Sequence, residues 1–149
     1  MRHNFLLSLL LLLILVPSSM ALSLWSPCVS LTKADIEARL GKAVPCRHQN
    51  EGWECFGDRD DFPIKLQIDA SGAIKEMTMR HSCNGIGSLR RKLDKLIPQE
   101  SRGKLSEKSG PILANCDVRY TETYECLTIE YWEFACQGCA PASVTVTWK

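Results

Sequence analysis

Apolar and polar residues alternate with a period of two along two stretches of the chain. Polar side chains such as Lys65 and Thr145 separate the apolar ones. This alternation predicts antiparallel strands that place one face on a core and the other in water. The turn sequence Asp69-Ala-Ser-Gly72 then leads into another strand over about residues 73–81. The alternating apolar positions are Ile64, Leu66 and Ile68, and then Val144, Val146 and Trp148.

A short helix is predicted before the first of these strands. Thr32 and Asp35 have the spacing of a capping box, with Asp in place of the usual Glu. Leu31 and Ile36 occupy the two positions of a hydrophobic staple. Gly41 can end this helix in a left-handed conformation.

A second helix is predicted between Ser88, as its N-cap, and Pro98, which ends it. Its apolar side chains share one face, and basic side chains lie around the other sides. We interpret the basic surface as a solvated helix face, with contact to an acidic partner as the alternative. The polar residues 99–110 are predicted to form a surface loop. The apolar positions are Leu89, Leu93, Leu96 and Ile97, and the basic ones are Arg90, Arg91, Lys92 and Lys95.

The same series of signals, a helix, then a segment between two cysteines, then an alternating strand, occurs twice along the chain. The segments Cys46–Cys55 and Cys116–Cys126 each consist of a cysteine, a polar stretch and an aromatic-Glu-Cys triplet. A helix signal precedes each segment and an alternating strand follows it. We therefore predict an α+β fold of two tandem helix-plus-antiparallel-sheet units, stapled by disulfides, with the helices on one face. The predicted units are residues 22–87 and 88–149.

Residues 1–21 have the pattern of a secretory signal peptide. Arg2 precedes an apolar run over residues 5–16, and Ser19-Met20-Ala21 provides the small residues of a cleavage site before Leu22. The apolar run is shorter than a helix that crosses a bilayer. We therefore expect a secreted or periplasmic protein with no membrane anchor after cleavage of the signal.

Charge and cysteine content restrict the possible functions. The 149 residues include 18 basic and 17 acidic side chains, and this balance excludes a nucleic-acid binder that works by neutralising phosphates. Eight cysteines in an exported chain indicate disulfide bonds, although the sequence alone does not choose the pairs. A metal framework is disfavoured because only His48 and His81 follow the predicted leader.

Residues 31–81 resemble the repeat unit of the β-lactamase inhibitor protein family. The shared features are the helix from Leu31 to Gly41, Cys46, the Trp53-Glu-Cys55 triplet, and two strands joined by an Asp-x-x-Gly turn. The related small outer-membrane assembly lipoproteins share the Leu-Gly helix end and the later strands. The resemblance is looser over residues 88–149.

This resemblance also implies a disulfide framework. In the inhibitor, two units lie in tandem, and each has a disulfide between the loop after its helix and its first strand. The implied bonds here are Cys46–Cys55 and Cys116–Cys126. The remaining cysteines are then predicted to pair as Cys28–Cys83 and Cys136–Cys139.

The sequence predicts a non-catalytic protein that needs no cofactor and no metal. It contains no Gly-x-Ser-x-Gly or His-Glu-x-x-His motif. Cys136 and Cys139 have the spacing of a redox pair, but Pro141 and a strand follow them where a thioredoxin-like unit would have a helix. A disulfide within a loop is the favoured interpretation.

An alternative function is copper or thiol handling in the periplasm. Met77, Met79, His81 and Cys83 alternate and would share one face of a strand. Thioether, imidazole and thiolate groups are the ligands that select Cu(I). The competing interpretation is that the methionines fill the core and Cys83 forms a disulfide.

Protein binding is the preferred function. Leu127, Ile129 and Tyr131 alternate with Trp132 and Phe134. If the first three residues face the core, Trp132 and Phe134 stand on the open sheet, where large aromatic side chains commonly anchor interfaces. The alternative is that a loop covers them.

A second candidate contact lies in the loop after Cys55. The inhibitor family has an acidic-aromatic contact loop at this place, and the corresponding residues here are Asp58, Asp60, Asp61 and Phe62. A solvated turn is the alternative interpretation. We therefore expect an inhibitor or immunity-type partner of a secreted or envelope enzyme. An envelope assembly factor is the rival class.

Overall fold

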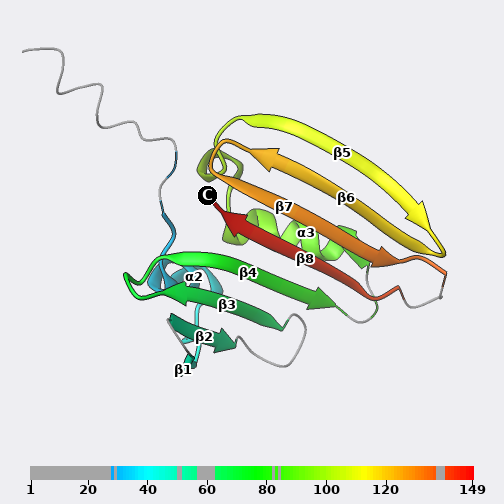
Figure 1. Cartoon of the computed structure of the whole chain (residues 1–149). Helices are drawn as coiled ribbons and strands as arrows, with labels where there is room; N and C mark the ends of the chain where they lie inside the picture. Colours follow the sequence, from blue (N-terminus) through cyan, green and yellow to red (C-terminus); the bar gives the residue numbers. More distant parts are fainter. Residues whose placement is uncertain are drawn as a thin grey trace, which may run out of the picture.

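The computed structural model describes residues 28, 30–49, 52–56, 63–81, 83, 85–136 and 140–149 (Figure 1). The predicted leader over residues 1–21 and the acidic-aromatic loop lie outside these ranges. In the described ranges, neither helix has the length and apolar character needed to cross a membrane.

Eight strands form one antiparallel sheet in the order β1-β2-β3-β4-β8-β7-β6-β5. A helix precedes β1 and a second helix precedes β5. The elements are α2 Lys33–Leu40, β1 Cys46–Gln49, β2 Gly52–Phe56, β3 Ile64–Asp69, β4 Ile74–His81, α3 Gly85–Leu96, the 3₁₀ helix η2 Gln99–Ser101, β5 Leu105–Ala114, β6 Asp117–Tyr124, β7 Leu127–Phe134 and β8 Ala142–Trp148.

The predicted division into two helix-plus-sheet units is wrong. Strand β4 pairs with β8 from Glu76↔Thr147 to His81↔Ala142, so the sheet is continuous through the middle of the molecule. The pairing satisfies backbone groups that would otherwise line two exposed strand edges. It also aligns buried residues of both strands, such as Met77 and Val146, over one core.

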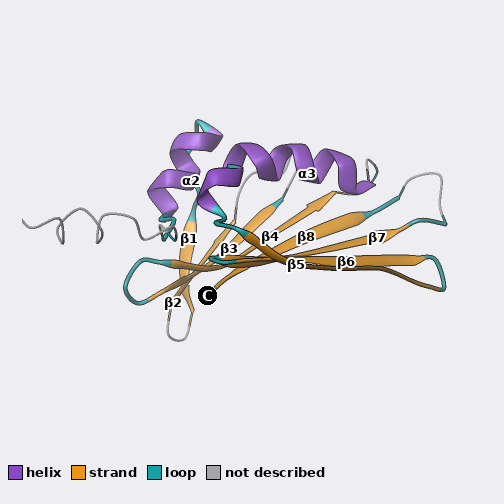
Figure 2. Cartoon of the chain, turned by 90° about the horizontal axis from the view of Figure 1, so that it is seen from above, coloured by secondary structure: helices purple, strands orange, loops and turns teal. Residues whose placement is uncertain are grey.

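Both helices lie on the same face of the sheet (Figure 2). Helix α3 packs on β4, β7 and β8, and it also contacts α2. It begins at Gly85, earlier than the predicted N-cap Ser88, because the buried Ile86 extends its apolar stripe by one turn. The predicted boundary between residues 87 and 88 therefore falls inside α3. The predicted apolar face is buried as expected at Leu89, Leu93, Leu96 and Ile97.

The local signals for the first helix are confirmed. The Thr32 N–H donates to the Asp35 carboxylate over 2.8 Å, and the Asp35 N–H donates to the Thr32 hydroxyl over 3.3 Å. Leu31 and Ile36 are both buried in the core. Gly41 has φ of 71° and its N–H donates to the Glu37 carbonyl, which ends α2.

The prediction of a surface loop over residues 99–110 is wrong for most of that range. It contains η2 and the first half of β5, the longest strand of the sheet. Every residue of β5 is exposed, so no apolar alternation marks it in the sequence. Its pairing with β6 defines the strand, with irregular register around Gly110 and Pro111.

The Cys46–Cys55 disulfide is confirmed, since these residues are direct partners on β1 and β2. The predicted Cys116–Cys126 bond is wrong because all of β6 lies between the two residues. Its eight residues span roughly 26 Å at about 3.3 Å each. Cys116 instead bonds to Cys136, beyond the end of the neighbouring strand β7.

The other two predicted pairs are also wrong. Cys28 bonds to Cys126 rather than to Cys83, and this bond ties the segment before α2 to the turn between β6 and β7. Cys136 bonds to Cys116 and therefore not to Cys139. Cys83 is also disulfide-bonded.

Candidate binding face

The candidate site is the face of the sheet opposite α2 and α3, which we call the open face (Figure 2). Leu127, Ile129 and Tyr131 of β7 are buried under α3, as predicted. By strand alternation, Trp132 and Phe134 belong to the opposite face. Both side chains are half-buried.

The two aromatic residues lie in cross-strand rows with residues of β6. Trp132 is the register partner of Arg119, and Phe134 is the partner of Asp117. Arg119 is in turn the partner of Ile112 on the edge strand β5, where Ile112 is 64% exposed. Ile112, Trp132 and Phe134 therefore lie at one end of the open face, with Arg119 between Ile112 and Trp132, and we call these three residues the β5–β7 patch.

The centre of the open face is polar and carries short side chains. Ser143, Thr145 and Thr147 of β8 are the outward residues of the strand that joins the two halves of the sheet. Thr78 of β4 lies opposite Thr145. These residues make the middle of the open face polar.

A second apolar contact lies at the other end of the open face. Phe56 of β2 is 42% exposed and stands opposite Lys65 of β3. A cavity of about 370 Å³ lies beside it, with Thr78 and Arg80 of β4 in its lining. The Arg47 guanidinium lies 4.9 Å from the centre of the Phe56 ring.

Glu54 organises the charges at this end. Its carboxylate contacts Lys65 at 2.5 Å and Arg47 at 2.6 Å. Hydrogen bonds from Lys65 and then Arg47 hold the pKa of Glu54 below its ordinary value. The Glu54 carboxylate is therefore ionised near neutral pH and paired with both cations.

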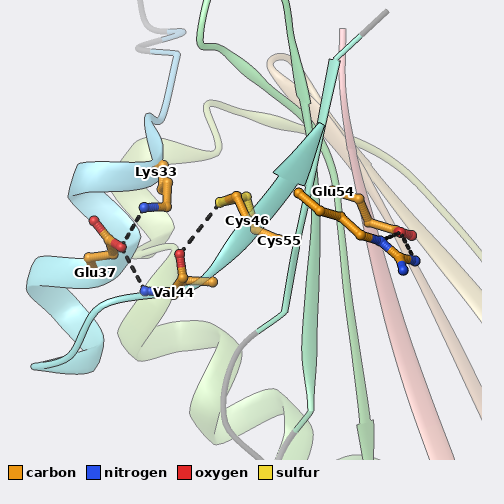
Figure 3. The surroundings of a disulfide bond; sticks show 7 residues. Lys33, Glu37, Val44, Cys46, Glu54 and Cys55 are labelled. Carbon is orange, nitrogen blue, oxygen red and sulfur yellow. Dashed lines mark hydrogen bonds and ion pairs between the residues drawn. A yellow bond between two sulfur atoms is a disulfide. The ribbon is translucent and has the colours of Figure 1, made fainter. Parts of the chain in front are cut away.

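A disulfide and a hydrogen bond hold β1 on the helix side of the sheet. Figure 3 shows the Cys46–Cys55 disulfide between α2 and the strand pair, with Glu54 on the far side of the strands. The Glu37 carboxylate accepts the Val44 N–H at 2.6 Å and pairs with Lys33 at 2.7 Å. The Glu37–Val44 bond connects α2 to the start of β1, and the disulfide joins β1 to β2.

Only part of the predicted site can be located. Trp132 and Phe134 lie together on β7, whereas Asp58, Asp60, Asp61 and Phe62 are outside the described residues. Sequence reasoning missed Phe56, although its place two residues after Glu54 gives it the same outward face. It also missed Ile112, because the strand that carries it has no alternating pattern.

The predicted copper ligands are not available in the described structure. Met77 and Met79 are fully buried in the core, and Cys83 is disulfide-bonded. His81 accepts a hydrogen bond from the Cys83 N–H at 3.0 Å. Across the described ranges, no group of three or more His, Cys, Asp or Glu side chains could hold a metal ion.

The thiol interpretation fails for a similar reason. Cys136 bonds to Cys116, so the spacing of Cys136 and Cys139 does not form a redox pair. Every cysteine in the described part of the chain is disulfide-bonded.

No protein-family model, curated protein or solved structure matches this chain.

Proposed function

We propose that this protein is an exported binding protein that uses its open face to bind a secreted or envelope enzyme, as an inhibitor or immunity-type partner. The β5–β7 patch is the observation that carries the proposal. Ile112, Trp132 and Phe134 lie at one end of a sheet face whose centre is polar. Aromatic anchors within a polar surround are typical of protein interfaces.

The cysteine chemistry supports export. Disulfides link Cys28 to Cys126, Cys46 to Cys55 and Cys116 to Cys136. Such bonds persist in oxidising compartments such as the periplasm or the exterior of the cell. Together with the leader pattern of residues 1–21, they favour a secreted or periplasmic location.

The resemblance of residues 31–81 to the β-lactamase inhibitor protein family supports inhibition, and the related assembly lipoproteins make envelope assembly the alternative. In this proposal, Trp132 and Phe134 bury apolar area against the enzyme. Asp58, Asp60 and Asp61 steer a basic target toward the face, because acidic groups at an interface mainly speed association. Phe62 is proposed to contact the same target.

Capture from the native secreted and envelope fractions, followed by an activity assay of the captured enzyme, tests the proposal. We expect Trp132→Ala to weaken binding by about 2 kcal/mol, mostly through faster dissociation. Trp53→Ala is a matched control because Trp53 is also partly exposed but lies away from the β5–β7 patch. Both variants should keep the circular dichroism spectrum of the parent.

Two results would refute the open-face assignment. One is a Trp132→Ala variant that folds and binds as tightly as the parent. The other is a Trp53→Ala variant that loses binding as strongly as Trp132→Ala does. Binding without any loss of enzyme activity would instead indicate an assembly partner rather than an inhibitor.

A further inference from the structure

The two edge strands of the sheet differ in length. Strand β1 has 4 residues and forms one edge, whereas β5 has 10 residues and forms the other (Figure 1). All of β5 is exposed, and within the described ranges it pairs only with β6. Its outer side therefore presents unpaired backbone N–H and C=O groups along roughly 34 Å, at about 3.4 Å per residue.

Exposed apolar side chains are concentrated on this edge strand. Five large apolar side chains are exposed among the described residues, and three of them belong to β5. Leu105 is 43% exposed, Ile112 is 64% exposed and Leu113 is 72% exposed. Such an edge favours the addition of another strand, because pairing satisfies the backbone and buries apolar area at the same time.

A charged side chain or a proline commonly protects an edge strand from pairing, and β5 contains both. The Lys108 ammonium pairs with the Glu122 carboxylate of β6 at 3.2 Å, so its charge is already neutralised within the chain. Pro111 has no N–H to donate, but it falls within the irregular step of the ladder between Ser109 and Ile112. Neither residue therefore prevents pairing along β5.

The faces of β5 are symmetric about Ser109. Leu105 and Leu113 both lie on the helix side of the sheet, because their register partners are Tyr124 and Val118 on the inner face of β6. Each leucine lies four positions from Ser109 in the sequence. Each of these two intervals also contains one irregular step of the ladder. The same face is therefore reached at both ends of the strand.

We propose that β5 pairs with β5 of a second copy of this chain, antiparallel about a two-fold axis at Ser109. In this register Leu105 of one copy lies beside Leu113 of the other, and the contact occurs twice because of the symmetry. Residues opposite each other then share a face, as strand pairing requires. This self-complementary placement of the two leucines favours a second copy over a strand from a different protein.

The proposed dimer would join the two sheets into one. The two-fold axis is perpendicular to the sheet, so the helices of both copies lie on the same side and both open faces lie on the other. The β5–β7 patch of each copy stays on the open face. The proposal therefore does not depend on the enzyme partner proposed above.

Sedimentation equilibrium of the full disulfide-bonded protein tests the dimer. From about 5 µM to about 1 mM, the mass should rise from one chain to two, with a Kd of about 100 µM or tighter. Leu113→Asp should weaken the dimer about tenfold or more, because it places a charge beside Leu105 of the second copy. Gln49→Asp introduces the same charge on the opposite edge strand β1 and should dimerise as the parent does.

A cysteine at the proposed axis tests the register. Ser109→Cys should form a disulfide between two copies under mild oxidation, because the two Cα atoms would lie about 4.5–5.5 Å apart. Glu107→Cys is a matched control on the same strand, since its two copies would lie about 13 Å apart. Non-reducing electrophoresis with peptide mapping distinguishes the new bond from exchange with the native disulfides.

The proposal is overturned if the protein stays monomeric up to about 1 mM, which would leave the β5 edge for an extended segment of a different protein. It is also overturned if Leu113→Asp dimerises as tightly as the parent, or if Gln49→Asp weakens the dimer as strongly. Cross-linking of Glu107→Cys as readily as Ser109→Cys would refute pairing about Ser109. Should Leu113→Asp fail to fold, the concentration series and the two cysteine variants still decide the question.

Discussion

Each half of the sheet contains one buried glutamate that pairs with an arginine and a lysine, but the two clusters connect different elements of the fold. In the β1–β4 half, Glu54 is 7% exposed and contacts Arg47 and Lys65. In the β5–β8 half, Glu122 is 5% exposed and contacts Arg90 at 2.6 Å and Lys108 at 3.2 Å.

The difference lies in which elements the carboxylate connects. The partners of Glu54 stand on the strands directly beside it, β1 and β3, and all three side chains face the open side. Glu122 faces the helix side, where Arg90 reaches it from α3 and Lys108 from the edge strand β5. Glu54 thus links strands that backbone pairing already holds, whereas Glu122 links two layers.

Two tyrosine hydroxyls also interact with the negatively charged Glu122 carboxylate. The hydroxyls of Tyr124 and Tyr131 lie 3.1 and 3.2 Å from its carboxylate. Arg90 also lies over the Tyr131 ring, 4.9 Å from its centre. Burial raises the pKa of Tyr131 well above its ordinary value, so its hydroxyl stays protonated and can donate to Glu122. The Arg–Glu–Lys cluster of Glu122 therefore contributes more to stability than that of Glu54, because two tyrosine hydroxyls also bond to the Glu122 carboxylate.

The largest expected effect concerns how the two halves are cross-linked. The Cys28–Cys126 bond closes a loop with a sequence separation of 98, whereas Cys46–Cys55 closes one with a separation of 9. From loop-closure entropy we expect Cys28→Ala with Cys126→Ala to cost about 4–5 kcal/mol of unfolding free energy, and Cys46→Ala with Cys55→Ala about 2.7 kcal/mol. Urea unfolding of both double variants measures the difference. Equal losses would contradict the loop-size explanation.

Replacing Glu122 should have the next largest effect. Glu122→Gln removes the charge that Arg90 and Lys108 pair with, and we expect it to cost about 2 kcal/mol of unfolding free energy. Glu130→Gln is a control, because Glu130 is exposed on the open face of the neighbouring strand. Thermal or urea unfolding tests both variants. A Glu122→Gln variant as stable as the control would show that the cluster does not join the layers.

The contribution of Glu122 should also depend on pH in a defined direction. Burial raises the pKa of Glu122, but the hydrogen bond from Lys108 and the charge of Arg90 outweigh it, so the pKa lies below the ordinary 4.5. Because the pKa of Glu122 is lower in the folded state than in the unfolded state, the ionised carboxylate stabilises the fold fully above the unfolded-state pKa. This stabilisation is lost as the pH falls through the folded-state pKa. The stability difference between the parent and Glu122→Gln should therefore be constant near neutrality and shrink below about pH 4.5. A difference that grows in acid would contradict this assignment.

The smallest effect is expected for Glu54→Gln. Glu54 bridges strands whose backbones are already paired, so fewer contacts depend on its charge than on that of Glu122, and water and salt screen its attraction to the exposed Arg47. The loss of stability should be smaller than for Glu122→Gln. It should shrink further in about 1 M salt, where the Debye length is about 3 Å. A loss as large as that of Glu122→Gln would remove the contrast between the two halves.

The sequence by itself determined the features that act within a few residues. The capping box of Thr32 and Asp35 and the left-handed Gly41 are local, because each involves only neighbours along the helix. Alternation likewise identified the core faces of β3, β7 and β8, since side-chain direction repeats every two residues whichever strand is adjacent. The same rule places the Tyr131 side chain on the core face of β7 and the Trp132 side chain on its open face.

The tertiary structure alone decided which strands are neighbours. Alternation does not encode the partner of a strand edge, so the β4–β8 pairing that makes one sheet from two four-stranded halves was not predictable. The aromatic-Glu-Cys pattern occurs twice, yet Cys55 has Cys46 across a hairpin while Cys126 has Cys28 from a distant segment. Likewise, Glu122 meets Arg90 and Lys108 only because the fold brings α3 and β5 to the same strand. These contacts join residues far apart in the chain, and their energy exists only once the sheet has formed.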